Sequence, residues 1–248
     1  MTASPSAADD ADDANAADAK SDARIQQLWP VRILTRRFDR HGEINPALIE
    51  LFRRYQRDHP AAGASPSSVY SSPDNFAEGL EHPALAELQK FILDNVFAVA
   101  RDANAAYWKP GLSLDVKLTG LWFQISNDFG FHEVHVHGNC SWSGVYYVQS
   151  GDASRAKSDR HANGMPNGVT RFYGPYMEYL AGGHGDRGNF YLNDHAHDCY
   201  PQDGMLCVFP SHLKHMVFPY QGEQDRIIVS FHAVVDADQA LRYDYSFN

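Results

Sequence analysis

The second half of the chain consists of short β-rich runs separated by turn residues, and this alternation constrains the fold more than any other feature. Each run is bounded by Gly, Asn, Asp or Pro, which favour turns. We expect eight strands, near 115–126, 131–137, 142–149, 169–173, 188–192, 204–209, 214–219 and 225–235. Eight short strands at this spacing predict a sandwich or barrel, and a jelly roll has eight.

The first half of the chain predicts helices. Residues 28–38 have the character of an edge strand, with Pro30 near its start. Asn45 is expected to cap a helix that opens with Pro46 and runs to about Asp58. Residues 60–75 are rich in Ser, Pro and Ala, which indicates a loop.

A second helix is expected after Pro83, with an apolar stripe at three- and four-residue spacing and an end near Tyr107. Two helices followed by a run of strands fit helices packed on the outside of one sheet. The predicted fold class is therefore mainly β: a jelly-roll core with N-terminal helices on one of its sheets.

The domain organisation follows from composition. Residues 1–24 form an acidic, low-complexity tail that cannot bury enough apolar surface to order itself. The remaining residues 25–248 are expected to form one domain. It comprises an N-terminal strand and helices (25–112), the jelly-roll core (113–235) and a C-terminal extension (236–248).

Charge and cysteine usage exclude several functional classes. The net charge of −10 argues against a nucleic-acid partner, because phosphate binding needs clustered Lys and Arg. There is no apolar run long enough to span a membrane and no visible signal peptide. Three cysteines without a CxxC pair fit a cytoplasmic protein. The expected partner is a small-molecule substrate, and a homodimer is a candidate assembly.

Histidines dominate the predicted core: ten of the 13 lie between His132 and His232. Alternate side chains of a strand face the same way, so His135 and His137 should project together and could hold one metal ion. By the same rule Glu133 shares their face, and His132 lies on the other. A histidine pair without metal remains an alternative at this point.

A third ligand is expected from the Pro turn that follows the run 204–209. His215 opens the next predicted strand, and Arg226 begins the one after it. In a jelly roll these strands lie near the first histidine pair. His215 could then complete a facial triad with open coordination positions, as in non-haem Fe(II) oxygenases.

The order of these blocks resembles the 2-oxoglutarate- and Fe(II)-dependent oxygenases of the double-stranded β-helix superfamily. The resemblance covers residues 115–235 and rests on His135-x-His137, the run Ser143–Val148, a Phe-Pro-Ser turn before His215, and Arg226. It implies Fe(II), 2-oxoglutarate and O2 as cofactors. It also implies hydroxylation of a small-molecule or amino-acid-like substrate, with release of succinate and CO2.

In the resemblance, His135 matches the first iron ligand and His215 the last. The wider superfamily usually has Asp or Glu at the position of His137, where this sequence has an imidazole. Either three histidines hold the iron, or Glu133 or a water takes the place of His137. A halogenase is disfavoured, because those enzymes have a small residue at that position.

Arg226 matches the residue that pairs with the far carboxylate of 2-oxoglutarate, and Arg171 and Arg187 are its rivals. Ser230 lies on the same strand face and could add a hydrogen bond. One of Tyr146 and Tyr147 should face inward. The further candidates for cosubstrate binding lie on strands that lead to the site: Trp122, Gln124 and Tyr146.

Two other functions remain open. A cupin-type three-histidine dioxygenase without 2-oxoglutarate explains the histidines equally well but leaves Arg226 without a role. A non-catalytic, metal-binding jelly roll is the second alternative. A further His-x-His, His195 and His197, could form a polar rim or another metal site. His212 should face solvent or support a metal ligand from behind, and His232 could line the pocket or sit in the core. The polar segments 150–168 and 176–189 are candidate substrate lids.

Overall fold

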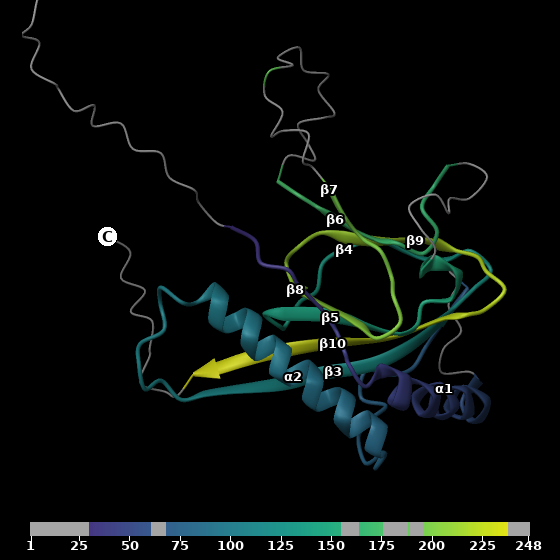
Figure 1. The fold of residues 1–248 in the computed structure, drawn as a ribbon, viewed down its shortest axis with the longest axis horizontal. Helices are drawn as coiled ribbons and strands as arrows, with labels where there is room; N and C mark the ends of the chain where they lie inside the picture. The colour runs from purple at the N-terminus through teal and green to yellow at the C-terminus, as the bar shows by residue number, and fades with distance from the viewer. Residues whose placement is uncertain (1–29, 61–67, 155–163, 176–187, 189–195, 238–248) are drawn as a thin grey trace, which may run out of the picture. The chain divides into compact units, whose positions relative to one another are not determined.

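The structure is a computed structural model that describes residues 30–60, 68–154, 164–175, 188 and 196–237 (Figure 1). The chain divides into two compact units, Met1–Pro30 and Val31–Asn248, and every described helix and strand belongs to the second. The predicted acidic tail lies outside the described residues. The predicted C-terminal extension is described only at positions 236 and 237, which still belong to the last strand.

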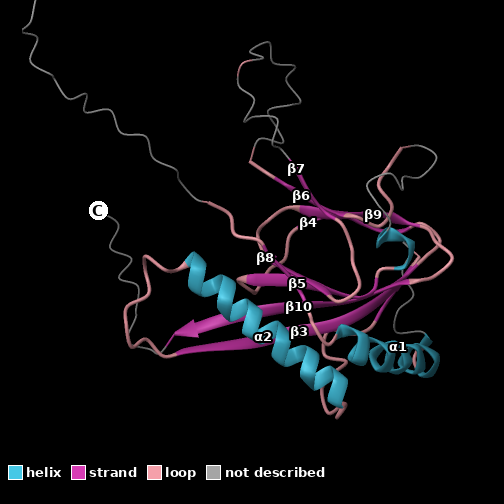
Figure 2. Ribbon diagram, in the orientation of Figure 1, coloured by secondary structure: helices cyan, strands magenta, loops and turns pink. Residues whose placement is uncertain are grey.

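Two antiparallel sheets form the body of the second unit (Figure 2). The six-stranded sheet has the order β1-β8-β5-β10-β3-β2, and the four-stranded sheet has the order β4-β9-β6-β7. The strands are β1 (Leu34–Arg37), β2 (Val69–Ser71), β3 (Leu114–Ser126), β4 (Gly130–His135), β5 (Trp142–Gln149), β6 (Thr170–Tyr173), β7 (Ala196–Cys199), β8 (Met205–Pro210), β9 (His215–Tyr220) and β10 (Arg226–Ala237).

The eight strands from β3 to β10 form two facing sets of four, β8-β5-β10-β3 and β4-β9-β6-β7. This arrangement confirms the predicted jelly roll. Seven of the eight predicted runs coincide with observed strands. The eighth, 188–192, lies outside the described residues apart from residue 188, and the remaining core strand is β7, which the sequence reading did not predict.

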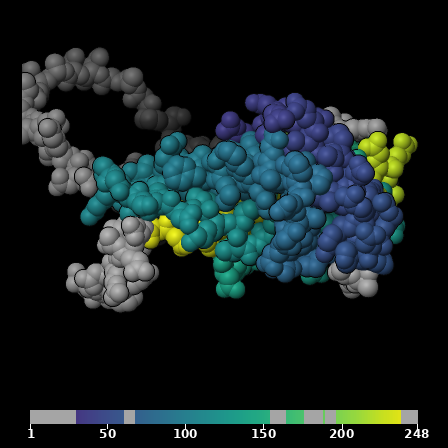
Figure 3. All heavy atoms as spheres, turned by 90° about the horizontal axis from the view of Figure 1, so that it is seen from below, coloured from purple at the N-terminus to yellow at the C-terminus, as the bar shows by residue number. Residues whose placement is uncertain are grey.

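Both helices, α1 (His41–Asp58) and α2 (Pro83–Ala103), lie on the outer face of the six-stranded sheet (Figure 1). Phe52 of α1 stacks on Phe123 of β3 with ring centroids 4.4 Å apart. Viewed from the helix side, the surface consists mainly of atoms from the first half of the chain (Figure 3). The prediction of helices covering one sheet is therefore confirmed, and the other face of this sheet is left to meet β4-β9-β6-β7.

The predicted start of the first helix is wrong, because α1 begins at His41 rather than at Asn45. Asn45 is a buried residue inside the helix and does not cap it. Its Nδ2 donates to the backbone oxygen of Val148 at 2.7 Å. Val148 is skipped where the pairing of β5 with β10 shifts register, so its carbonyl needs a partner from outside that ladder.

The remaining differences are small. β1 lies at an edge of the six-stranded sheet, as predicted for residues 28–38, but only Leu34–Arg37 pair. The predicted loop 60–75 contains the short edge strand β2. The second helix starts at Pro83 as predicted and ends at Ala103, four residues early. Among the described residues, no helix combines the length and apolar character needed to cross a bilayer.

Candidate active site

Three histidine side chains converge at one end of the four-stranded sheet. His135 ends β4, His137 follows it, and His215 begins β9. His135 and His215 are direct partners in the β4–β9 pairing. The backbone N–H of His137 donates to the Ser211 carbonyl at 2.9 Å, which fixes the chain just beyond β4. One ligand atom of each imidazole lies within 4.8 Å of the others, so the group could hold a metal ion.

Two of these imidazoles are oriented in the same way. Nδ1 of His135 lies 2.7 Å from the Glu133 carbonyl oxygen, and Nδ1 of His215 lies 2.8 Å from that of Leu213. A carbonyl oxygen only accepts hydrogen bonds, so each Nδ1 carries the proton. Each Nε2 is then left with a free lone pair, which is the form that binds metals.

Burial favours the neutral form of two of the three histidines, His137 and His215. Burial lowers the pKa of His215 to about 4, an effect that the Leu213 carbonyl partly offsets. Burial also lowers the pKa of His137 to about 3, and the neighbouring histidines His215 and His232 lower it further. Metal binding does not have to displace protons from such imidazoles near neutral pH.

The prediction that Glu133 shares the face of His135, with His132 on the opposite face, is wrong. His132 pairs with Val217 and His135 with His215, so three steps along β4 match two steps along β9. The extra residue forms a bulge, which resets the alternation of side chains. As a result His132 lines the same pocket as His135, and Glu133 is exposed. This excludes Glu133 from the histidine cluster.

His132 is a titratable pocket residue that the sequence analysis placed on the wrong face. Its Nε2 lies 3.1 Å from Nε2 of Gln124, so the two side chains form a hydrogen-bonded pair. Burial is the main cause that lowers the pKa of His132 to about 4, and the charge of Arg226 adds to it. No sequence pattern indicates the bulge in β4. A prediction from strict alternation of side chains therefore placed His132 on the wrong face.

Arg226 lines the pocket that contains the histidines, at the first position of β10. Its side chain is only 1% exposed, and none of its guanidinium nitrogens has a hydrogen-bond partner among the described residues. The guanidinium lies over the ring of Tyr147, 5.3 Å from the centroid. A buried cation without an anionic partner is costly, so this group is poised to receive an anion.

Three further predicted residues also line the pocket. Ser230 shares the face of Arg226 on β10 and pairs with Trp122 of β3, and Ile228 pairs with Gln124. Among the described residues, the lining is Trp122, Gln124, His132, His135, His137, Gly144, Val145, Thr170, Phe209, His215, Val217, Arg226, Ile228, Ser230 and Phe231. Polar groups are thus set among apolar side chains that could contact a methylene chain.

Tyr146 was predicted at the site, but the structure places it on the opposite face of β5. Its hydroxyl donates to Oδ1 of Asn45 at 2.8 Å, in the core beneath the helices. Side chains alternate along a strand, so its neighbour Tyr147 faces Arg226 instead. The Tyr147 hydroxyl lies 3.0 Å from Oγ1 of Thr170.

The other arginines and histidines predicted near the site differ in their partners and in their exposure. Arg171 is engaged by Asp198 through two contacts of 2.7 and 2.8 Å, whereas Arg187 lies outside the described residues. His212 is exposed, as predicted. His197 is exposed on β7, and its predicted companion His195 is not described. His232 packs against His137 and Trp122, with ring centroids 4.7 and 4.8 Å apart. The middle of the first candidate lid, 155–163, and all of the second except residue 188 lie outside the described residues.

Residues 120–232 match a protein-family model described as "Putative 2OG-Fe(II) oxygenase". No curated protein matches the sequence significantly. Among solved structures, HygX from Streptomyces hygroscopicus with nickel and 2-oxoglutarate bound has a TM-score of 0.51 and 13% identity, over 82% of either chain. The non-haem α-ketoglutarate-dependent epimerase SnoN from nogalamycin biosynthesis has a TM-score of 0.52 and 12% identity, over 82% of this chain and 76% of its own.

These comparisons agree with the geometry. The two structural likenesses show that the chain shares the double-stranded β-helix fold of HygX and SnoN. The family match runs through β4 to β9 and includes the histidine cluster and Arg226. Residues 120–232, a little under half of the chain, are therefore similar to the 2-oxoglutarate- and Fe(II)-dependent oxygenases.

Proposed function

We propose that the protein is an Fe(II)- and 2-oxoglutarate-dependent oxygenase that hydroxylates a small-molecule or amino-acid-like substrate. In this proposal His135, His137 and His215 hold the iron, and Arg226 binds the far carboxylate of 2-oxoglutarate. The observation that carries the proposal is one pocket that holds both the histidine cluster and a buried guanidinium without a partner among the described residues.

The residues present suit both groups. Imidazole nitrogens are ligands that Fe(II) accepts, and three of them on one side of a metal leave positions free for cosubstrate and O2. Bound together, iron and 2-oxoglutarate supply the activation of O2, with release of CO2 and succinate. The planar guanidinium of Arg226 can form two parallel hydrogen bonds to a carboxylate, which a lysine cannot.

Other side chains would position the cosubstrate. Val145, Val217 and Ile228 supply apolar surface for its methylene groups. The hydroxyl of Ser230 would add a hydrogen bond on the face of Arg226, and Trp122 and Gln124 would close the β3 side. The net charge of −10 disfavours a polyanionic substrate. A cytoplasmic location and a homodimer remain predictions.

The rival function is that of a three-histidine dioxygenase that does not use 2-oxoglutarate. In the part of the chain that the structure describes, the histidine cluster contains no carboxylate, which favours this function as a second candidate. It gives no role to the desolvated Arg226 unless its own substrate is an anion. A non-catalytic, metal-binding jelly roll would also leave Arg226 unexplained.

Succinate formation tests the proposal. The purified protein, given Fe(II), ascorbate, O2 and 2-oxoglutarate, should release succinate slowly even without its prime substrate. His135→Ala should abolish this release, and His212→Ala, which alters an exposed histidine, should not. Succinate at the level of a protein-free control would contradict the proposal.

A further inference from the structure

Arg226 lies at a strand end, where the backbone can open more easily than in the middle of a strand. It is the first residue of β10, directly after the turn between β9 and β10. The pairing of β10 with β5 shifts register between Ile227 and Ile228, so the ladder is irregular beside it. Hydration of its buried cation would further favour opening. On its other side β10 pairs regularly with β3, where Arg226 lies opposite Ser126, so the β5 side is the one that needs further support.

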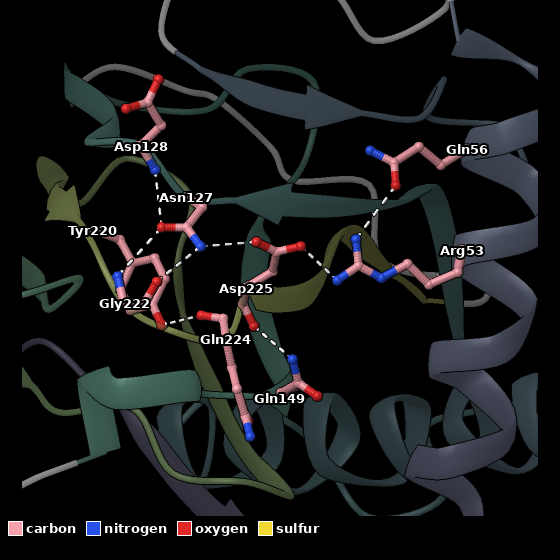
Figure 4. Close-up of polar contacts among 9 residues, drawn as sticks. All are labelled: Arg53, Gln56, Asn127, Asp128, Gln149, Tyr220, Gly222, Gln224 and Asp225. Atoms are coloured by element: carbon pink, nitrogen blue, oxygen red, sulfur yellow. Dashed lines mark hydrogen bonds and ion pairs between the residues drawn. The ribbon is translucent and has the colours of Figure 1, made fainter.

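The preceding residue, Asp225, is held by three other elements (Figure 4). Its Oδ2 accepts from Nη2 of Arg53 on α1 at 2.5 Å, and its Oδ1 accepts from Nδ2 of Asn127 at 2.9 Å. Nε2 of Gln149, at the end of β5, donates to its backbone oxygen at 2.6 Å. These bonds tie the start of β10 to α1, to the β3–β4 turn and to β5.

Asn127 ties the rest of the turn to the same place (Figure 4). Its Nδ2 also donates to the Gly222 carbonyl at 3.1 Å, and its Oδ1 accepts from the backbone N–H of Gly222 at 3.2 Å. The hydroxyl of Tyr220 donates to the Gln224 carbonyl. The turn is therefore fixed at both ends, and Asp225 is the member of this network next to Arg226.

The carboxylate of Asp225 is engaged by Arg53, leaving the guanidinium of Arg226 without an anionic partner among the described residues. Successive side chains of a strand face opposite ways, so Asp225 points to the helix side and Arg226 into the pocket. Asp225 and Arg53 are 26% and 35% exposed, so their attraction is less screened than that of a surface pair.

We propose that Asp225 is a positioning residue, which with Arg53 fixes the start of β10 so that the Arg226 guanidinium stays in the cosubstrate pocket. This inference rests on the proposed function, in which Arg226 binds 2-oxoglutarate. The pair acts through the backbone. It should therefore set the affinity for 2-oxoglutarate without affecting the histidine cluster, whose His135 and His215 belong to the other sheet.

Two variants test the proposal from opposite sides. Asp225→Asn keeps the size of the side chain and an acceptor for Asn127 but loses the charge that holds Arg53. Arg53→Met removes the cation and keeps an unbranched side chain on α1. Each should raise the KM and Kd for 2-oxoglutarate about tenfold, since a partly buried charged hydrogen bond contributes about that much. The kcat at saturating 2-oxoglutarate and the Kd for Fe(II) should stay within about twofold of wild type.

The controls separate positioning from general stability. Glu87→Gln breaks the ion pair between Glu87 of α2 and Arg40, which are 30% and 56% exposed, and should leave the KM for 2-oxoglutarate unchanged. Arg53→Lys keeps the cation and should restore most of the affinity lost in Arg53→Met. Amide hydrogen exchange in 221–228 should be faster in Asp225→Asn than in wild type, and exchange in β4 and β9 should not change.

The proposal is overturned if both variants fold and bind 2-oxoglutarate as wild type does. It is also overturned if kcat and iron affinity fall together with the cosubstrate affinity, because that pattern describes a general loss of structure. Failure of the proposed function is distinguishable, since the wild-type protein itself would then show no 2-oxoglutarate binding, and the inference would fall with it.

Discussion

The two sheets of the jelly roll obey the alternation of strand side chains to different degrees. Along the β3–β10 pairing of the six-stranded sheet, Arg226, Ser230 and Trp122 lie on the pocket face, as strict alternation requires. In the four-stranded sheet, β4 contains shifts of register, and His132 and Glu133 exchange their expected faces. Spacing therefore predicts side-chain direction where the ladder is regular, and fails where an unpaired residue interrupts it.

The sheets also divide the proposed chemistry. His135 and His215 belong to the four-stranded sheet, with His137 directly after β4, whereas Arg226 belongs to the six-stranded sheet. Metal binding and cosubstrate binding are then properties of opposite walls of one pocket. Substitutions on one wall should change one property and leave the other largely intact.

The largest effect is expected from removing a histidine of the cluster. His215→Ala should weaken Fe(II) binding by more than a hundredfold, because loss of a supporting residue alone costs about 10–100-fold. Anaerobic metal titration measures this directly. The matched control is His212→Ala, which alters an exposed residue of the same turn. Tight Fe(II) binding by His215→Ala would place the metal elsewhere.

Acid should destabilise the four-stranded side of the metal-free protein. Burial lowers the pKa values of His132 and His215 to about 4 in the folded state, from an ordinary value of 6.5. The unfolded chain therefore binds more protons below pH 6.5, and stability falls as the pH decreases from 6.5 towards 4, by several kcal/mol in total. Urea unfolding across this range checks the prediction.

His132→Gln should reduce the loss of stability at acid pH by the amount that this one histidine contributes. Hydrogen exchange should show β4 and β9 opening before β3 and β10 as the pH falls. Stability that stays constant between pH 6.5 and 4 would contradict the assignment of these histidines as buried and neutral.

Because of the bulge in β4, substitutions of two neighbouring residues should have unequal effects on stability. His132→Ala removes a partly buried partner of Gln124 and should lower the free energy of unfolding by about 2 kcal/mol. Glu133→Ala alters an exposed side chain and should change it by less than about 0.5 kcal/mol. Denaturant unfolding measures both. A larger loss for Glu133→Ala would mean that the alternation in β4 is unbroken.

The smallest effect concerns the two faces of β5. Tyr146→Phe leaves Oδ1 of Asn45 without its donor and should cost about 1 kcal/mol of stability, with no change in 2-oxoglutarate affinity. Tyr147→Leu removes the ring beneath Arg226 and should weaken 2-oxoglutarate binding instead. Thermal unfolding and calorimetric titration of both variants test the pair. Weaker 2-oxoglutarate binding by Tyr146→Phe would contradict its position in the helix-side core.

Much of this could be predicted from the sequence. The jelly roll follows from short runs bounded by turn residues, and the group of His135, His137 and His215 follows from spacing and strand order. What could not be predicted depends on irregular pairing. The β4 bulge placed His132 in the pocket, and the register shift in β5 left a carbonyl that draws Asn45 into the body of α1. Both features arise from contacts between strands distant in sequence, which no local pattern encodes.

Binding of 2-oxoglutarate to the iron-loaded protein without O2 tests the central claim most directly. Calorimetry should show one site per chain in wild type, and Arg226→Ala should lose at least thirtyfold in affinity, because truncating a buried charged partner costs about 2 kcal/mol or more. Arg171→Ala, which removes an arginine already paired with Asp198, should retain the affinity. No binding by wild type, or equal binding by Arg226→Ala, would contradict the account.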